Sequence, residues 1–180
     1  MNALWQPSSN FTRGSNLFHF ATFLEKEFDL KFDDYNSILE WSVNDVDAFW
    51  KAIWKYYDIQ HDGEVVTAYS TSTEMLGTKW FEGTKVNYTE HVFKAKTKYS
   101  PAIIFQSEHL PLQEISWAEL EQQVASFAQY LRKNGIQKGD RVAAYLPNIP
   151  QALVAFLATN AVGAVWSSCS PDFGTPSVLD

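Results

Sequence analysis

The residues best suited to chemistry stand in the segment 167–174, which carries hydroxyl groups, the only cysteine and a carboxylate. Cys169 has no histidine near it in sequence and adjoins an apolar run, so we interpret it as a buried, inert thiol rather than a nucleophile. Pro171, Asp172 and Phe173 remain as a candidate ligand-binding loop. The alternative is a turn in which Asp172 accepts backbone N–H bonds at the start of the next helix.

A second candidate is the segment 77–85, GTKWFEGTK, because phosphate loops use glycines, a lysine and hydroxyl groups. Its second glycine is followed by Thr-Lys rather than by Lys and a hydroxyl residue, and Trp80 and Phe81 are bulky. We interpret these two rings as packing the N-terminal part of the chain against the rest. The four histidines lack the HxxxH or HxH spacing of metal ligands, so we expect no metal site.

The elements around the segment 167–174 predict a strand, a helix and a second strand. Gly139 and Asp140 indicate a turn, and the apolar run 141–146 is typical of a buried strand. Residues 149–162 are apolar around most of a helix, which Gly163 ends. A second buried strand over 164–168 makes this a βαβ unit with parallel strands. The segment 167–174 then lies at the carboxyl end of a strand, where open α/β sheets place ligands.

The first half of the sequence is predicted to be mainly helical. Residues 1–15 are polar and are predicted to be irregular, whereas 16–28 show the period of an amphipathic helix. A second helix is predicted over 41–57, with Ser42 as its N-cap and Trp41 packed on Val46. Its buried face is predicted to consist of Val46, Phe49, Trp50, Ile53, Trp54 and Tyr57. A loop with a strand at 65–69 is predicted for 58–78.

The region between these two parts is predicted to contain a hairpin between two helices. A short helix is expected over 89–98, followed by strands at 102–106 and 113–116 that form a hairpin. Ser116 and Glu119 have the spacing of a capping box. They predict the start of a helix that ends at Gly135.

One family resemblance extends over almost the whole sequence. Residues 166–174 read WSSCSPDFG, and upstream stand WQP at 5–7, WSV at 41–43, FWK at 49–51, KWFEG at 79–83 and NY at 87–88. In order and spacing these motifs resemble the adenylate-forming acyl-CoA synthetases, and most closely the acetoacetate-CoA ligases. The resemblance implies an α/β fold. It places a helical cap at 1–83 and, at 84–180, the first βαβ elements of a large AMP-binding domain, which is expected to be truncated.

The resemblance also implies an activity. Intact relatives convert acetoacetate, ATP and coenzyme A into acetoacetyl-CoA, AMP and diphosphate, with Mg²⁺ as a cofactor. Their phosphate loop, magnesium-binding carboxylate and catalytic lysine correspond to positions beyond residue 180. We therefore assign no catalytic residue here, and we expect the chain alone to be inactive and to bind no cofactor tightly. Pro171, Asp172 and Phe173 are expected to border the coenzyme A channel.

Composition excludes several other classes of protein. A net charge of -7 without a Lys/Arg cluster argues against nucleic acid as a partner. No apolar run reaches the roughly 18 residues of a membrane span, and no secretory signal precedes the first helix, so we expect a cytoplasmic protein that acts on small molecules. The rival hypothesis is a non-catalytic interaction or dimerisation module, which would self-associate through an exposed sheet edge.

Overall fold

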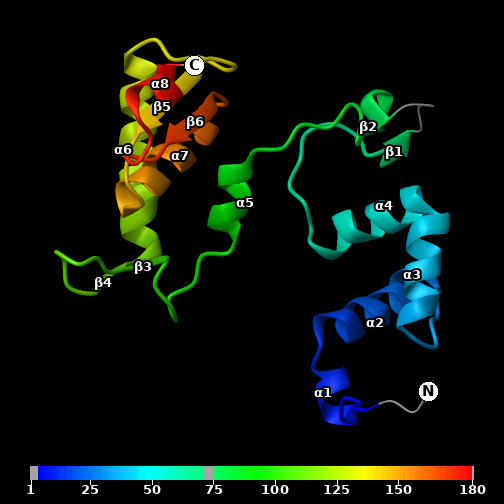
Figure 1. Ribbon diagram of the computed structural model, residues 1–180. Coiled ribbons are helices and arrows are strands. Elements are labelled where there is room, and N and C mark those ends of the chain that lie inside the picture. Colours follow the sequence, from blue (N-terminus) through cyan, green and yellow to red (C-terminus); the bar gives the residue numbers. More distant parts are fainter. Residues whose placement is uncertain (1–3, 71–74, 180) are drawn as a thin grey trace. The chain divides into compact units, whose positions relative to one another are not determined.

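A computed structural model of the chain describes residues 4–70 and 75–179. The chain forms two compact units, which comprise residues 1–85 and 86–180 (Figure 1). Helices dominate the first unit, and the second combines helices with short strands. The mixed α/β class predicted from the sequence is confirmed.

The described part of the first unit contains α1 (Ser9–Arg13), α2 (Asn16–Phe28), α3 (Tyr35–Asn44), α4 (Val46–Tyr56), β1 (Tyr69–Ser70), the 3-10 helix η1 (Met75–Gly77) and β2 (Lys79–Trp80). The bounds of α2 are those predicted. The prediction of an irregular start was wrong for α1, because the Ser8 hydroxyl accepts the N–H of Phe11 at 3.3 Å and caps a short helix. Residues 71–74, inside the predicted loop, lie outside the described residues.

The prediction of one helix over 41–57 was wrong in its start. Trp41 and Ser42 belong to α3, and Ser42 donates its hydroxyl hydrogen to the Leu39 carbonyl instead of capping a helix. Asp45 separates α3 from α4, since its backbone leaves the helical region (φ -127°, ψ 70°) and its carboxylate accepts the N–H of Ala48 at 3.1 Å. A short polar side chain that satisfies an exposed N–H is the usual reason for a helix to begin.

The core of the first unit lies between α2 and α4. Phe20, Leu24 and Ala52 are buried, and the partly buried Phe49, Ile53 and Tyr56 pack against them. The predicted face of α4 was therefore wrong in part. Tyr57 is 59% exposed, whereas Ala52, which the prediction did not include, is buried against Phe20 and Leu24 of α2.

The second unit contains α5 (Tyr88–Lys94), β3 (Ile103–Phe105), β4 (Gln113–Ile115), α6 (Trp117–Lys133), β5 (Arg141–Tyr145), α7 (Pro150–Ala161), β6 (Val165–Cys169) and α8 (Thr175–Leu179). Each element predicted for this region is present, although α5 is shorter than expected. Strands β3 and β4 form the predicted antiparallel hairpin. The capping box at Ser116 and Glu119 is confirmed, as is Gly135 after the end of α6, with φ at +84°.

The predicted βαβ unit is confirmed, with β5 and β6 paired in parallel from Arg141 opposite Val165 to Tyr145 opposite Cys169. Helix α7 packs against α5, α6 and β6, and Leu157 and Ala158 at its centre are almost fully buried. Figure 1 shows α6 and α7 beside the strand pair. The second unit thus has one core, formed mainly by α6 and α7.

The expectation that both strands are buried was wrong for one of their faces. Val142 and Trp166 face the core, but Tyr145 is 52% exposed and Val165 is 51% exposed on the opposite face. The register requires this alternation, since successive side chains of a strand point to opposite faces. Helix α7 covers the face with Val142 and Trp166. No described element of the second unit covers the face with Tyr145 and Val165 to the same extent.

Candidate functional site

The segment 170–174 leaves the sheet at the carboxyl ends of both parallel strands. Tyr145 and Cys169 end β5 and β6 side by side, and the Leu146 N–H donates to the Cys169 carbonyl at 3.2 Å. The loops that follow the two strands therefore start from the same edge of the sheet. This is the position expected for a ligand crevice in an open α/β sheet.

Hydrogen bonds within the segment fold it into a tight turn. The Phe173 N–H donates to the Ser170 carbonyl at 3.0 Å, as in a β-turn. The Ser170 hydroxyl donates to Asp172 Oδ2 at 3.0 Å and also accepts the Asp172 N–H at 3.4 Å. The three predicted site residues, Pro171, Asp172 and Phe173, thus lie together on one exposed turn.

The Tyr145 hydroxyl also holds this turn, and sequence reasoning missed it. It lies 2.7 Å from the Pro171 carbonyl oxygen and 3.0 Å from that of Phe173, so its single hydrogen is shared between two acceptors. Tyr145 is 26 and 28 residues away from its two acceptors in the sequence, so local spacing could not predict the contact. The predicted parallel pairing was the available signal, because it places the end of β5 beside the end of β6.

The alternative role for Asp172, as a cap of the next helix, differs from what the structure shows. Its carboxylate accepts from the Ser170 hydroxyl inside the turn, and α8 begins only at Thr175. Cys169 is half-buried beside Tyr145 rather than fully buried. The turn presents a carboxylate and the Phe173 ring, which is 50% exposed.

The glycine-containing segment 77–85 is a packed turn. Lys79 forms an ion pair with Glu82 at 2.5 Å, and the Phe81 ring stacks on Trp54 with centroids 4.1 Å apart. Trp80 meets Trp50 edge to face at 5.6 Å. Both rings therefore pack on α4 within the first unit. A lysine that is paired with a carboxylate and flanked by stacked rings does not form an open phosphate loop.

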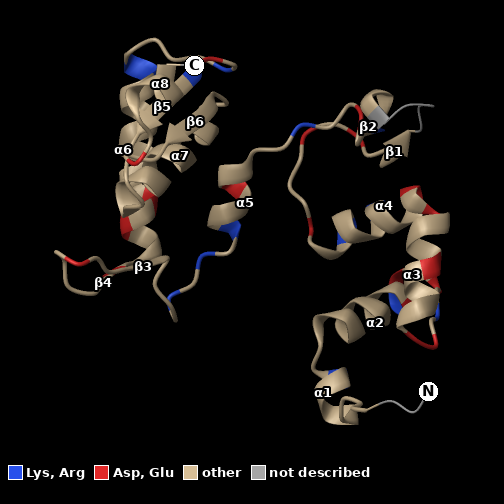
Figure 2. Cartoon of the chain, viewed as in Figure 1, with Lys and Arg blue, Asp and Glu red and all other residues tan. Residues whose placement is uncertain are grey.

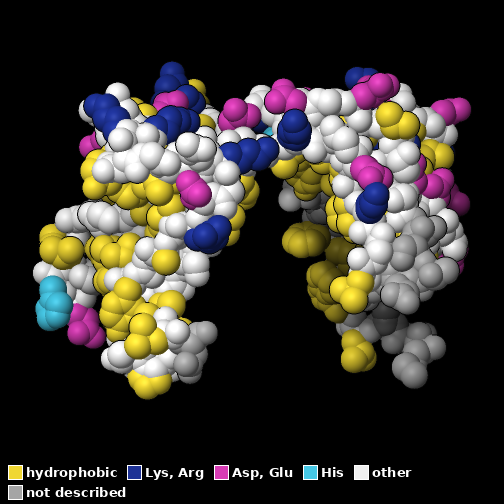
Figure 3. All heavy atoms as spheres, turned by 90° about the horizontal axis from the view of Figure 1, so that it is seen from above, with side chains coloured by type: hydrophobic (Ala, Val, Ile, Leu, Met, Phe, Trp, Pro, Cys, Tyr) yellow, Lys and Arg dark blue, Asp and Glu magenta, His cyan; other side chains and the backbone are white. Residues whose placement is uncertain are grey.

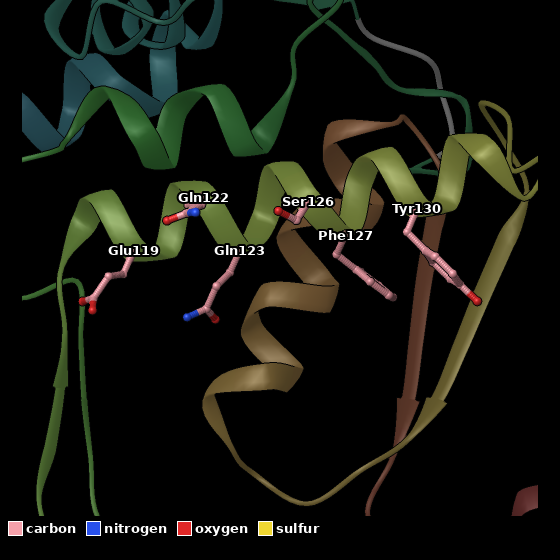
Figure 4. A pocket seen from close by; sticks show the side chains of 6 residues that line it. All are labelled: Glu119, Gln122, Gln123, Ser126, Phe127 and Tyr130. Carbon is pink, nitrogen blue, oxygen red and sulfur yellow. The ribbon is translucent and has the colours of Figure 1, made fainter.

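Two surface hollows lie elsewhere among the described residues. A shallow depression of about 740 Å³ runs along α6, lined by Glu119, Gln122, Gln123, Ser126, Phe127 and Tyr130. Figure 4 shows the rings of Phe127 and Tyr130 projecting from the same side of the helix as the side chains of Glu119 and Gln123. A groove of about 340 Å³ lies between α2 and α3 in the first unit. The depression along α6 is built on a single helix and is too open to hold a small molecule. Neither its shape nor its lining residues point to catalysis.

Charge is unevenly divided along the sequence. Residues 1–85 contain 13 acidic and 7 basic side chains, and residues 86–180 contain 8 and 7 (Figure 2). Neither unit has the excess of positive charge that phosphate backbones require. No helix among the described residues is long and apolar enough to cross a membrane.

Comparison with known proteins assigns this arrangement to a family. Residues 35–92 match the family described as acetyl-coenzyme A synthetase N-terminus, and residues 91–179 match AMP-binding enzyme. The solved acetoacetyl-CoA synthetase from Streptomyces lividans superposes with a TM-score of 0.91 and 40% identity over 99% of this chain. The chain belongs to the adenylate-forming acyl-CoA synthetases.

Within these synthetases the chain is similar to one branch over nearly its full length. Acetoacetyl-coenzyme A synthetase of Rhizobium meliloti is 38% identical over 178 residues, and acetoacetyl-CoA synthetase of Danio rerio is 38% identical over 181 residues. Each alignment covers 98% of this chain but only 27% or 26% of the relative. The match to the Streptomyces structure likewise covers 28% of that chain. The chain thus corresponds to the N-terminal quarter of an acetoacetyl-CoA synthetase.

Proposed function

We propose that this chain supplies the N-terminal part of an acetoacetate-activating ligase, which forms acetoacetyl-CoA, AMP and diphosphate from acetoacetate, ATP and coenzyme A. Within it, residues 1–83 act as the cap and 84–180 begin the AMP-binding domain. The observation that carries the proposal is the WSSCSPDFG loop, because it leaves the carboxyl edge of a parallel strand pair in a chain 40% identical to a solved acetoacetyl-CoA synthetase. A cytoplasmic location and small-molecule substrates belong to the same proposal.

The turn 170–173 fits one part of coenzyme A. Phe173 offers an exposed ring, and the negative Asp172 disfavours the phosphates of the nucleotide end. The uncharged pantetheine arm, with its amides and alkyl segments, suits such a surface. Pro171, Asp172 and Phe173 would therefore border the thiol arm, which brings the attacking sulfur to the acyl-adenylate.

ATP and Mg²⁺ find no comparable fit among the described residues. No group of three or more His, Cys, Asp or Glu side chains in the described segments could hold a metal ion, and the segment 77–85 is a packed turn. Positioning and neutralising a transferring phosphorus centre requires charged groups that converge on it. We therefore assign adenylation to the part of the ligase outside this chain and derive no step of it here.

A chimera tests the proposal directly. This chain replaces the matched 28% of the Streptomyces lividans synthetase, and formation of acetoacetyl-CoA is measured with acetoacetate, ATP and coenzyme A. We expect activity in the chimera and none in the 180-residue chain alone. A folded chimera that forms no acetoacetyl-CoA would contradict the proposed function.

One observation favours a second candidate, an interaction or dimerisation module. The face of β5 and β6 opposite α7 exposes about half of Tyr145 and of Val165. Hydrophobic side chains also gather elsewhere at the surface of both units (Figure 3). Exposed apolar faces beside unpaired strand edges promote association. A chain that dimerises through this face, and whose chimera is inactive, would favour the second candidate.

A further inference from the structure

We propose that Tyr145 is the positioning residue of the coenzyme A loop, through its hydroxyl bond to the backbone on both sides of Asp172. This inference rests on the proposed function, since it concerns how the loop 170–173 meets coenzyme A. The two acceptor carbonyls, those of Pro171 and Phe173, lie 2.7 Å and 3.0 Å from one hydroxyl oxygen. Tyr145 is not proposed to touch coenzyme A itself.

The position of Tyr145 makes it a rigid support. It is the last residue of β5, whose backbone is paired with β6 along five residues. A tyrosine side chain has only two rotatable torsions before its hydroxyl, so little freedom is lost when it makes the bond. The loop therefore takes its position from the sheet edge rather than from its own short turn.

The remaining bonds of the loop are local and do not fix its direction. The contacts from Ser170 to Asp172 and Phe173 span two or three residues. Such bonds preserve the shape of the turn but leave it free to swing about its connections to β6 and α8. The Tyr145 hydroxyl reaches the loop from another strand, so it is the contact that sets where Phe173 is presented.

Removal of one oxygen atom tests this role. Tyr145→Phe keeps the ring, and Tyr130→Phe serves as the matched control because Tyr130 is a tyrosine of similar exposure (58% against 52%) on α6. In the 180-residue chain, we expect Tyr145→Phe to speed amide exchange about fivefold at Asp172 and Phe173, whose N–H groups are bonded inside the turn; fivefold is the size of one ordinary hydrogen bond. The melting temperature should fall by no more than a few degrees, because a single hydrogen bond is lost from the folded state, and amide exchange in α6 and α7 should not accelerate more than exchange in the loop.

Kinetics of the chimera supply the second measurement. Tyr145→Phe should raise the KM for coenzyme A about fivefold while kcat at saturating coenzyme A and the KM for ATP stay unchanged, because an uncharged hydrogen bond is lost only from the loop. Loop exchange equal to that of the unmodified chain, or an unchanged KM for coenzyme A, would overturn the role of Tyr145. If the chimera without the Tyr145 substitution is inactive, the proposed function is wrong. Amide exchange in the loop 170–173 then decides by itself whether Tyr145 positions the loop.

Discussion

At the scale of single residues, Asp47 shows how one carboxylate can connect distant parts of a small unit. Its Oδ1 accepts the N–H groups of Ala68 at 2.6 Å and Tyr69 at 3.1 Å, and its Oδ2 lies 2.7 Å from Lys51 Nζ. Partial burial raises the pKa of Asp47, but the hydrogen bonds from Lys51, Tyr69 and Ala68 outweigh that effect and hold the pKa below its ordinary value. The charged form therefore stabilises the fold.

Replacing this carboxylate should weaken the first unit. Asp47→Ala leaves two backbone N–H groups without their acceptor, and we expect a loss of about 1–3 kcal/mol in the free energy of unfolding. Urea titration followed by tryptophan fluorescence measures the change. Asp33→Ala, at an exposed position before α3, is the matched control and should be nearly neutral.

The same variant carries a pH prediction. A carboxyl group whose folded pKa is lowered contributes stability above its unfolded pKa and loses it as the pH falls through the folded value. The difference in the free energy of unfolding between the original chain and Asp47→Ala should thus be constant near neutral pH and shrink below about pH 4. A difference that persists at pH 2 would show that the carboxylate's charge has no part in the effect.

Phe81 carries backbone strain that its ring offsets. Its φ of 45° lies in the left-handed region, which costs a residue with a Cβ about 1–2 kcal/mol, while its ring stacks on Trp54. Phe81→Gly loses the stack but relieves the strain, whereas Phe81→Ala loses the stack and keeps the strain. We expect Phe81→Gly to be more stable than Phe81→Ala by about 1 kcal/mol in thermal unfolding, and the reverse order would contradict this account.

At the scale of elements, the start of α6 is fixed by two side chains. The Ser116 hydroxyl accepts the Glu119 N–H at 3.2 Å, and the Glu119 carboxylate accepts the Ser116 N–H at 2.8 Å. These backbone and side-chain bonds from Ser116 lower the pKa of Glu119. The capping box satisfies two N–H groups that a helix start leaves open.

Loss of this cap should be measurable. We expect Ser116→Ala to lower the stability of the second unit by about 1 kcal/mol, as for other N-cap serines. Ser126→Ala removes the same atom from the exposed middle of α6 and should be neutral or slightly stabilising, because alanine has the higher helix propensity. Equal effects of both substitutions on thermal unfolding would argue against a role for the cap.

At the scale of the whole molecule, the open face of the strand pair predicts association. An unpaired strand edge with apolar side chains beside it can pair with a strand of another chain. A lysine on the edge strand opposes such pairing. We expect the 180-residue chain to associate reversibly at micromolar to millimolar concentrations, and Val165→Lys to weaken that association. Sedimentation velocity measures it. Val66→Lys is the control, since Val66 is 65% exposed but lies in the other unit, outside the strands.

Elements with strong local signals could be predicted from the sequence. Helix α2 follows its apolar period, the hairpin β3–β4 and the βαβ unit follow their turn residues, and the Ser116 capping box is where its spacing indicates. The start of α4 was mistaken because Ser42 and Asp45 are both acceptable caps. Propensity alone does not choose between two such residues three positions apart.

The sequence by itself determined the type of nearly every element in the second unit, and the WSSCSPDFG segment determined the family resemblance. Local hydrogen bonding and apolar periodicity are encoded within a few residues, so they can be read without the fold. Only the tertiary structure decided that Tyr145 holds the loop, that Asp47 holds β1, and that Trp80 and Phe81 pack on α4. These contacts join residues about 20 to 30 positions apart, and their partners depend on how the strands and helices pack, which short-range spacing does not specify.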